Sequence, residues 1–165
     1  MTADRTGPVL QPIGPFDVDL LAELHHRCFT AIWDRPWNAK SFADVLAMPG
    51  AAGQILSVGD APVGFGITLQ AVDEVDVLLI GVLPEARGAG LGPMLLDSLL
   101  SAAASRGAAR ALLEVAAENR AAIATYTKVG FTICGRRKQY YPGPTDAILY
   151  ERALNSCRID DKSHQ

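Results

Sequence analysis

The sequence predicts a single domain of the mixed α/β (α+β) class. Three observations carry this prediction: apolar residues recur at helical spacing near the start, they alternate with period two from Gln54 onward, and strands then alternate with helices. A chain of 165 residues has the ordinary size of one domain. We therefore expect one domain over residues 16–154, between a flexible N-terminal extension, 1–15, and a polar C-terminal tail, 155–165.

The first half of the chain is expected to form two helices and three strands. Helical stripes cover residues 17–30 and 41–48, and the proline-containing loop between them holds two tryptophans. Residues 55–58 and 63–69 alternate around a Gly-Asp turn, which is typical of an antiparallel hairpin. The nearly continuous apolar run 75–82 suits a central strand covered on both faces.

The second half is expected to alternate helices and strands. A helix should begin at Pro93 and end near Gly107, because proline fits a first helical turn and glycine often follows a helix end. Residues 109–115 have the pattern of a strand. Asn119 is expected to cap the next helix, which should end at Gly130. The last strands are expected at residues 132–136 and 147–152.

Composition and charge argue against several function classes. Apolar residues make up 49% of the chain, but no apolar run reaches the roughly 20 residues of a transmembrane helix. The start also lacks the pattern of a secretory signal, so we expect a cytoplasmic protein that does not act on a membrane. A net charge of −3 argues against direct nucleic-acid binding. The three cysteines and the pair His25-His26 lack metal-ligand spacing, so no metal is expected.

A glycine-rich segment, Arg-Gly-Ala-Gly-Leu-Gly at residues 87–92, joins the buried strand to the next helix. Glycines let a backbone approach phosphate oxygens, and a helix N-terminus supplies unpaired N–H donors. The same residues also serve tight turns without any ligand. A Walker loop requires Gly-Lys-Ser/Thr where this chain has Gly92-Pro93-Met94, and a dinucleotide-binding turn requires glycine at position 93. Both of those alternatives are therefore disfavoured.

Two motifs of the chain resemble the GNAT superfamily of N-acetyltransferases. Residues 87–92 are similar to its Arg/Gln-x-x-Gly-x-Gly/Ala signature, and residues 119–131 to its Asn-x-x-Ala-x-x-x-Tyr-x-x-x-Gly-Phe block. Within the superfamily the chain most resembles the RimI-type N-terminal acetyltransferases, through Leu113-Glu114-Val115, Arg136-Arg137 and Tyr140-Tyr141-Pro142. The resemblance implies a central, mostly antiparallel mixed sheet of six to seven strands flanked by about four helices.

The resemblance also implies acetyl-CoA as a cosubstrate and assigns its binding residues. They are Ile80, Gly81, Val82, Arg87, Gly88, Ala89, Gly90, Leu91, Gly92, Asn119 and Tyr126, with the Val82 N–H as candidate donor to the thioester oxygen. Glu114 is the implied base, with Asp76 and Glu74 as rivals, and Tyr126 the implied proton donor to the CoA sulfur. An ion pair for Glu114 and core packing for Tyr126 are the structural alternatives.

Aromatic residues of two loops are the candidates for the acceptor side of the site. Trp37, Tyr140 and Tyr141 are candidates for an amine-acceptor groove, although loop packing accounts for them as well. The expected reaction is direct attack of a primary amine, because no cysteine lies in a recognisable nucleophile setting. For a RimI-like protein the amine is the N-terminal alanine of a ribosomal protein, whereas near relatives modify small-molecule amines. A non-catalytic acyl-CoA sensor or partner module is the alternative of another class, and we expect a monomer or weak homodimer.

Overall fold

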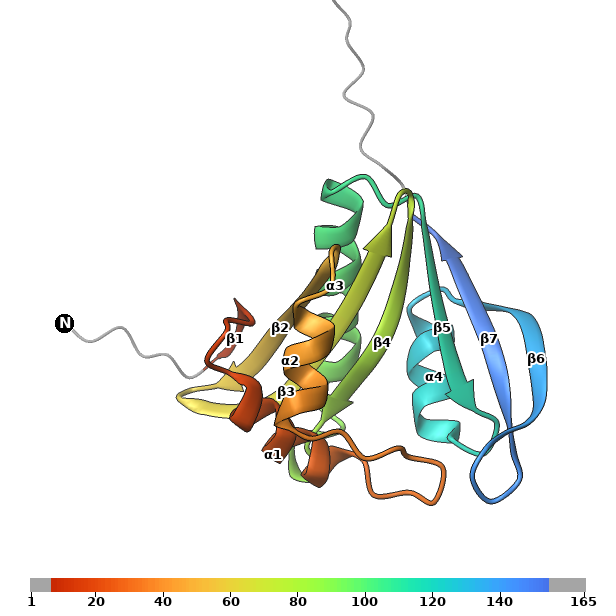
Figure 1. Ribbon diagram of the computed structural model, residues 1–165, viewed down its shortest axis with the longest axis horizontal. Helices are drawn as coiled ribbons and strands as arrows, with labels where there is room; N and C mark the ends of the chain where they lie inside the picture. The colour runs from red at the N-terminus through yellow and green to blue at the C-terminus, as the bar shows by residue number, and fades with distance from the viewer. Residues whose placement is uncertain (1–6, 155–165) are drawn as a thin grey trace, which may run out of the picture.

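The computed structural model describes residues 7–154 of the chain (Figure 1). These residues form a seven-stranded sheet in the order β1-β2-β3-β4-β5-β7-β6. Its strands are β1 (Pro8–Pro12), β2 (Ala51–Val58), β3 (Ala61–Ala71), β4 (Glu74–Val82), β5 (Arg110–Ala116), β6 (Thr132–Tyr141) and β7 (Thr145–Ala153). Within the described residues, only the β4–β5 pair is parallel, so the predicted mixed, mostly antiparallel sheet is confirmed.

Four α-helices cover the two faces of this sheet (Figure 1). On one face, α1 (Val18–Cys28) and α2 (Ala39–Leu46) bury their apolar stripes against β2 and β3. On the other face, α3 (Leu91–Ser105) packs on β2, β3 and β4, and α4 (Arg120–Lys128) shares a core cluster with β5 and β7. None of the helices in residues 7–154 is long and apolar enough to cross a membrane.

The N-terminal segment differs from its prediction. A flexible extension was expected over residues 1–15, but Pro8–Pro12 form β1 and pair antiparallel with β2. Two prolines conceal the strand pattern, and they are tolerated because an edge strand has N–H groups that need no partner. Residues 1–6 and the predicted polar tail 155–165 lie outside the described residues.

Two element boundaries also differ from the sequence pattern. Helix α3 begins at Leu91, so Pro93 takes the third helical position rather than the first. That position is equally tolerant, since the N–H groups of a first helical turn have no acceptor within the helix. Strand β6 continues to Tyr141, beyond the predicted end at residue 136, and its pairing with β7 is irregular between Arg137 and Tyr141.

Strands β4 and β5 stay together over a short length only. Residues 74–76 of β4 pair with residues 110–112 of β5, and the remaining residues of the two strands do not pair with each other. On its other side β4 carries an irregularity, because Ile67 of β3 pairs with Leu79 whereas Thr68 pairs with Val77. A bulge of this kind bends a strand and increases its twist. The bulge lies just after the last β4–β5 pair, where the two strands separate and the sheet opens (Figure 1).

Candidate active site

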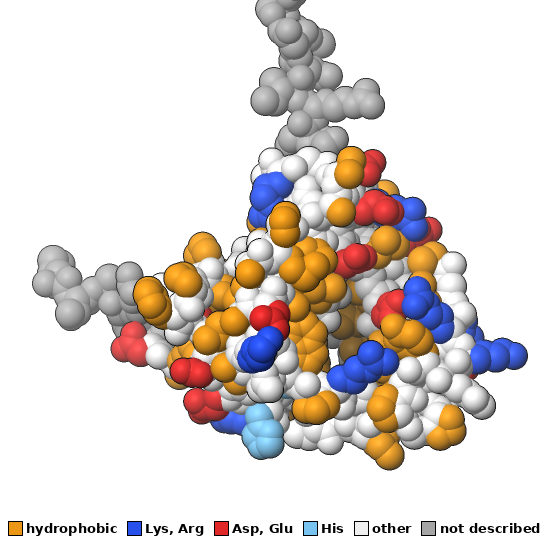
Figure 2. Space-filling view, viewed as in Figure 1, with side chains coloured by type: hydrophobic (Ala, Val, Ile, Leu, Met, Phe, Trp, Pro, Cys, Tyr) orange, Lys and Arg blue, Asp and Glu red, His pale blue; other side chains and the backbone are white. Residues whose placement is uncertain are grey.

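A cavity of about 600 Å³ occupies the opening where β4 leaves β5. Its walls come from the loop after α1, the end of β4, the glycine-rich turn, the start of α3 and one face of α4. All the predicted cofactor-binding residues except Ala89 line it. Figure 2 shows the molecule hollowed between the side that carries α1 and α2 and the side that carries β5, β6 and β7.

The glycine-rich turn presents bare backbone to the cavity. Gly88 and Gly90 have φ angles of +89° and +76°, and a Cβ added to either would meet no atom within 4 Å. Gly90 is the N-cap of the 15-residue helix α3 and supplies no side-chain cap. The amides of residues 88–92 donate to no acceptor within the described part of the chain. These residues can therefore hold an anionic diphosphate group.

The open edge of β4 supplies a second set of backbone groups. Leu83 N–H donates to Val63 O at 2.7 Å, and Gly81 lies opposite Phe65 in the same register. Because hydrogen-bonded and non-bonded pairs alternate in an antiparallel ladder, Ile80 and Val82 direct their N–H and C=O groups away from β3. Strand β5 has already left that side. The N–H groups of Ile80 and Val82 consequently face the opening.

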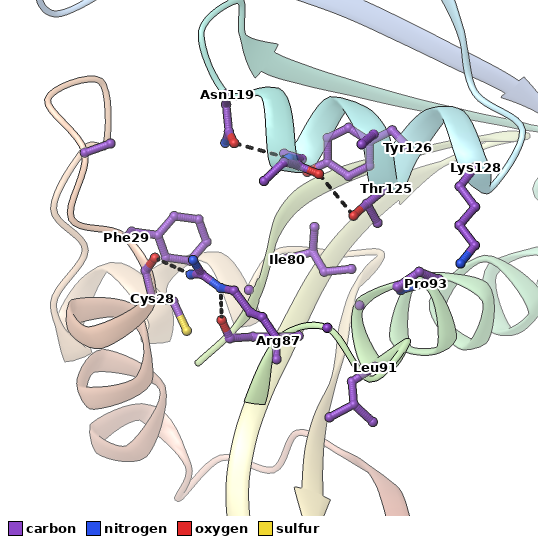
Figure 3. Close-up of a pocket in the computed structure, with 18 of the residues that line it drawn as sticks. Cys28, Phe29, Ile80, Arg87, Leu91, Pro93, Asn119, Thr125, Tyr126 and Lys128 are labelled. Atoms are coloured by element: carbon purple, nitrogen blue, oxygen red, sulfur yellow. Dashed lines mark hydrogen bonds between the residues drawn. The ribbon is translucent and has the colours of Figure 1, made fainter. Parts of the chain in front are cut away.

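Helix α4 places two predicted residues on the cavity wall (Figure 3). Asn119 caps the helix, since its side-chain oxygen accepts from Ala122 N–H at 3.2 Å, which confirms the predicted cap. Tyr126 is 8% exposed, and its ring lies 6.1 Å from that of Phe131 and 6.5 Å from that of Tyr150. Burial raises the pKa of its hydroxyl. Tyr126 is therefore both a core residue and a protonated group at the cavity wall.

The predicted carboxylates lie on β4 and β5 beside the parting of the strands. Glu114 Oε1 lies 3.3 Å from Arg137 Nη2, an ion pair whose partners are both partly exposed. Glu74 is instead paired with Arg110, at 3.2 Å between Arg110 Nη1 and Glu74 Oε2. Partial burial, together with the negative charges of Glu74 and Glu114, raises the pKa of Asp76. Glu74 and Glu114 are thus both ion-paired, as the structural alternative for Glu114 expects, whereas Asp76 forms no ion pair within residues 7–154, and none of the three carboxylates is among the residues that line the cavity.

The loop between α1 and α2, residues 29–38, meets the β6–β7 hairpin across the mouth of the opening. The guanidinium carbon of Arg35 lies 5.3 Å from the ring centre of Tyr140 and 5.8 Å from that of Tyr141. Arg137, the partner of Glu114, lies 5.2 Å from the ring centre of Tyr140. Burial raises the pKa of Tyr141 to about 12, and the Glu114 charge adds to the shift. Both tyrosines therefore lie on the Glu114 side of the opening.

The two tryptophans of the same loop have different surroundings. Trp37 packs against helix α2, with its ring 5.3 Å from that of Phe42 and 6.4 Å from that of buried His25. Trp33 lines the cavity instead. The sequence pattern could not separate them, because both are apolar residues in one loop. Among residues 7–154, no cluster of three or more His, Cys, Asp or Glu side chains could hold a metal ion.

Comparison with known proteins decides the family. The sequence matches the Acetyltransferase (GNAT) family over residues 18–131. The chain belongs to the GNAT family. It is 37% identical over 147 residues to the N-alpha-acetyltransferase RimI of Mycobacterium tuberculosis, covering 86% of this chain and 89% of that protein. An uncharacterized protein of Mycobacterium leprae is 38% identical over 157 residues, which are 92% of this chain but only 42% of that relative.

The fold of this GNAT protein also matches a solved relative. The crystal structure of the ribosomal-protein-S18-alanine N-acetyltransferase from Escherichia coli superposes with a TM-score of 0.82 at 29% sequence identity. The match covers 93% of this chain and 97% of the other. The predicted GNAT fold and the similarity to RimI-type acetyltransferases are therefore confirmed.

Proposed function

We propose that this GNAT protein transfers an acetyl group from acetyl-CoA to a primary amine, and that the amine is the N-terminal alanine of a ribosomal protein. The observation that carries the proposal is the parting of β4 and β5 beside the glycine-rich turn. The amides of residues 88–92 and the N–H groups of Ile80 and Val82, which point away from β3, face this same opening. RimI-like activity of the relatives supports the choice of acceptor.

Each step of the reaction has a candidate residue: Val82 and Tyr126 line the cavity, whereas Glu114 and Asp76 lie outside its lining. Acetyl-CoA would supply the activated acetyl group and a thiol leaving group. The Val82 N–H can donate to the thioester oxygen as negative charge develops there. Glu114 or Asp76 can take the proton of the attacking amine, directly or through water. The Tyr126 hydroxyl, kept protonated by its raised pKa, can donate a proton to the departing sulfur.

An N-terminal amine makes a moderate demand on the base. Its reference pKa is about 8, whereas that of a lysine side chain is about 10.4, so a larger share is neutral near pH 7. The acceptor would pass between loop 29–38 and the β6–β7 hairpin, which face one another through Arg35 and Tyr140.

A thiol-release assay with acetyl-CoA tests this proposal. The acceptors are peptides with N-terminal alanine, the same peptides with a blocked N-terminus and an internal lysine, and a panel of small amines. We expect turnover on the free N-terminal peptides, and a fall of about a hundredfold in kcat for Glu114→Gln if Glu114 is the base. The matched variant is Asp76→Asn, and the fall in kcat should appear in this variant instead if Asp76 is the base.

The outcomes of this assay separate the alternatives. Turnover on small amines alone would contradict the peptide acceptor and leave acetyl transfer in place. Tight CoA binding without turnover on any acceptor would contradict the enzyme proposal and favour an acyl-CoA sensor. Loss of activity in neither acidic variant would contradict both carboxylates as the base.

A further inference from the structure

Arg87, the first residue of the glycine-rich motif, directs its side chain to two backbone carbonyls. Its Nε–H donates to Val82 O at 2.9 Å, and its Nη2 donates to Cys28 O at 3.2 Å (Figure 3). Val82 is the last residue of β4 and Cys28 is the last residue of α1. The guanidinium therefore bridges the ends of a strand and a helix that are far apart in the sequence.

Two further contacts join the same elements. Gly81 leaves no room for a side chain, because an added Cβ would lie 2.9 Å from Phe29 Cε2 and 3.1 Å from Cys28 Cβ. Arg27 forms an exposed ion pair with Glu85 in the turn after β4. The carbonyls of a last helical turn have no partner inside the helix, so a cationic donor is well placed there. The end of α1 is consequently docked on the end of β4.

This junction lies between the two halves of the candidate active site. On one side, Val82 exposes its N–H to the opening while its C=O is held by Arg87. On the other side, the chain leaves α1 into loop 29–38, which lines the cavity through Phe29 and Trp33 and contacts Tyr140 through Arg35. The Arg87 side chain thus links the edge of β4, where the thioester carbonyl is proposed to bind, to loop 29–38 on the acceptor side.

We infer that Arg87 is a positioning residue, which holds loop 29–38 in register with β4 for the acceptor amine, and that it is not the principal phosphate ligand. This inference rests on the proposed function of the cavity. The other basic residue of the cavity lining is Lys128 on α4, which forms no ion pair within the described part of the chain. Figure 3 shows its side chain directed toward Pro93 at the start of α3. The cationic contact to a phosphate is accordingly assigned to Lys128.

The variants Arg87→Lys and Arg87→Ala test the inference, with Arg106→Ala as the control at an exposed arginine outside the cavity. Lysine keeps the positive charge but cannot bridge the two carbonyls as a planar fork does. Both Arg87 variants should therefore speed amide hydrogen exchange at Phe29 and Asp34 and raise the KM for the acceptor by about tenfold, more than they lower kcat. Calorimetry should show nearly unchanged CoA affinity in all three variants.

The opposite pattern would overturn the inference. If Arg87→Ala weakens CoA binding about tenfold, Arg87→Lys restores it and exchange in loop 29–38 stays as in wild type, Arg87 is a phosphate ligand. Unchanged exchange in both variants would equally contradict the positioning role. Failure of the positioning role can be distinguished from failure of the proposed function, because hydrogen exchange in loop 29–38 can be compared between wild type and variants even if the wild-type protein shows no turnover.

Discussion

Tyr126 is a packing residue whose hydroxyl is also the proton donor that we propose. Its ring is buried beside Phe131 and Tyr150, and its raised pKa keeps the hydroxyl protonated. A substitution that removes only the hydroxyl separates the two roles, because phenylalanine preserves the packing.

We expect Tyr126→Phe to lower kcat by about a hundredfold and to leave CoA affinity nearly unchanged. Since the pKa of Tyr126 lies above its usual range, wild-type kcat should not fall through ionisation of this group between about pH 8 and 10. Steady-state kinetics across that pH range, with calorimetry on both proteins, provide the measurement. An unchanged kcat in the variant would remove Tyr126 as proton donor.

At the residue scale, the sequence predicts positions better than it predicts contacts. The residues predicted from the two motifs, namely Asn119, Tyr126 and the glycines of residues 87–92, all line one cavity. Motif spacing does not reveal that the Arg87 guanidinium bonds to Cys28 O, because that contact depends on where α1 ends in space. For the same reason it does not distinguish Trp33, at the cavity, from Trp37, against α2.

At the element scale, strong periodic patterns are reliable and edge strands are not. Strands β3 and β4 and helix α3 have long apolar patterns that the packed core reproduces. Strand β1 contains two prolines in five residues, and β6 is exposed along nearly its whole length. Neither β1 nor β6 needs an alternating apolar pattern, because few of their side chains are buried. The extent of these two strands is therefore decided by pairing with β2 and β7 rather than by local sequence.

The close approach of α1 to β4 makes Gly81 a packing requirement. Gly81→Ala should lower the free energy of unfolding by about 1–3 kcal/mol, because the new methyl overlaps Phe29 and Cys28. Gly135→Ala on β6 is the matched control, since an added Cβ there meets Leu149 side-chain atoms only at 3.6 Å or more. Urea denaturation of both variants measures the difference. Equal stability of the two would contradict the close packing at Gly81.

The β6–β7 hairpin contains a pH-dependent contact next to Tyr140. The Asp146 carboxylate accepts from Gln139 N–H at 2.9 Å and from Arg136 Nε–H at 2.8 Å, and these hydrogen bonds hold its pKa below the usual range. A lowered folded-state pKa contributes stability above the unfolded value of about 3.9, and this contribution is lost as the pH falls through the folded value.

Asp146→Asn should therefore lower Tm at pH 7 and reduce the loss of Tm on acidification below about pH 4. Thermal denaturation of both proteins from pH 7 to pH 3 measures this difference. Curves that coincide over the whole range would contradict the stabilising contact, and parallel but offset curves would contradict its pH dependence.

At the scale of the whole molecule, the proposed function depends on a sheet whose strands β4 and β5 pair over only part of their length. Strands β1–β4 and strands β5, β7 and β6 form two parts joined by three residue pairs, with α3 behind the first part and α4 behind the second (Figure 1). Alternation of strands and helices predicts the sheet but not the length over which β4 and β5 pair. The cavity therefore follows from tertiary geometry, and the motifs only indicate its position.

We propose that the backbone amides of residues 88–92 hold the diphosphate of acetyl-CoA at this opening. Isothermal titration calorimetry on wild type, Gly90→Val and Gly107→Val tests this proposal. Both glycines have positive φ, +76° and +96°, and open surroundings, so valine is strained at either position, but only Gly90 faces the cavity. We predict one-to-one binding with a Kd on the order of 1–100 μM in wild type and Gly107→Val, and at least about tenfold weaker binding in Gly90→Val. Absence of binding to folded wild-type protein, or equal binding in the two variants, would contradict the account.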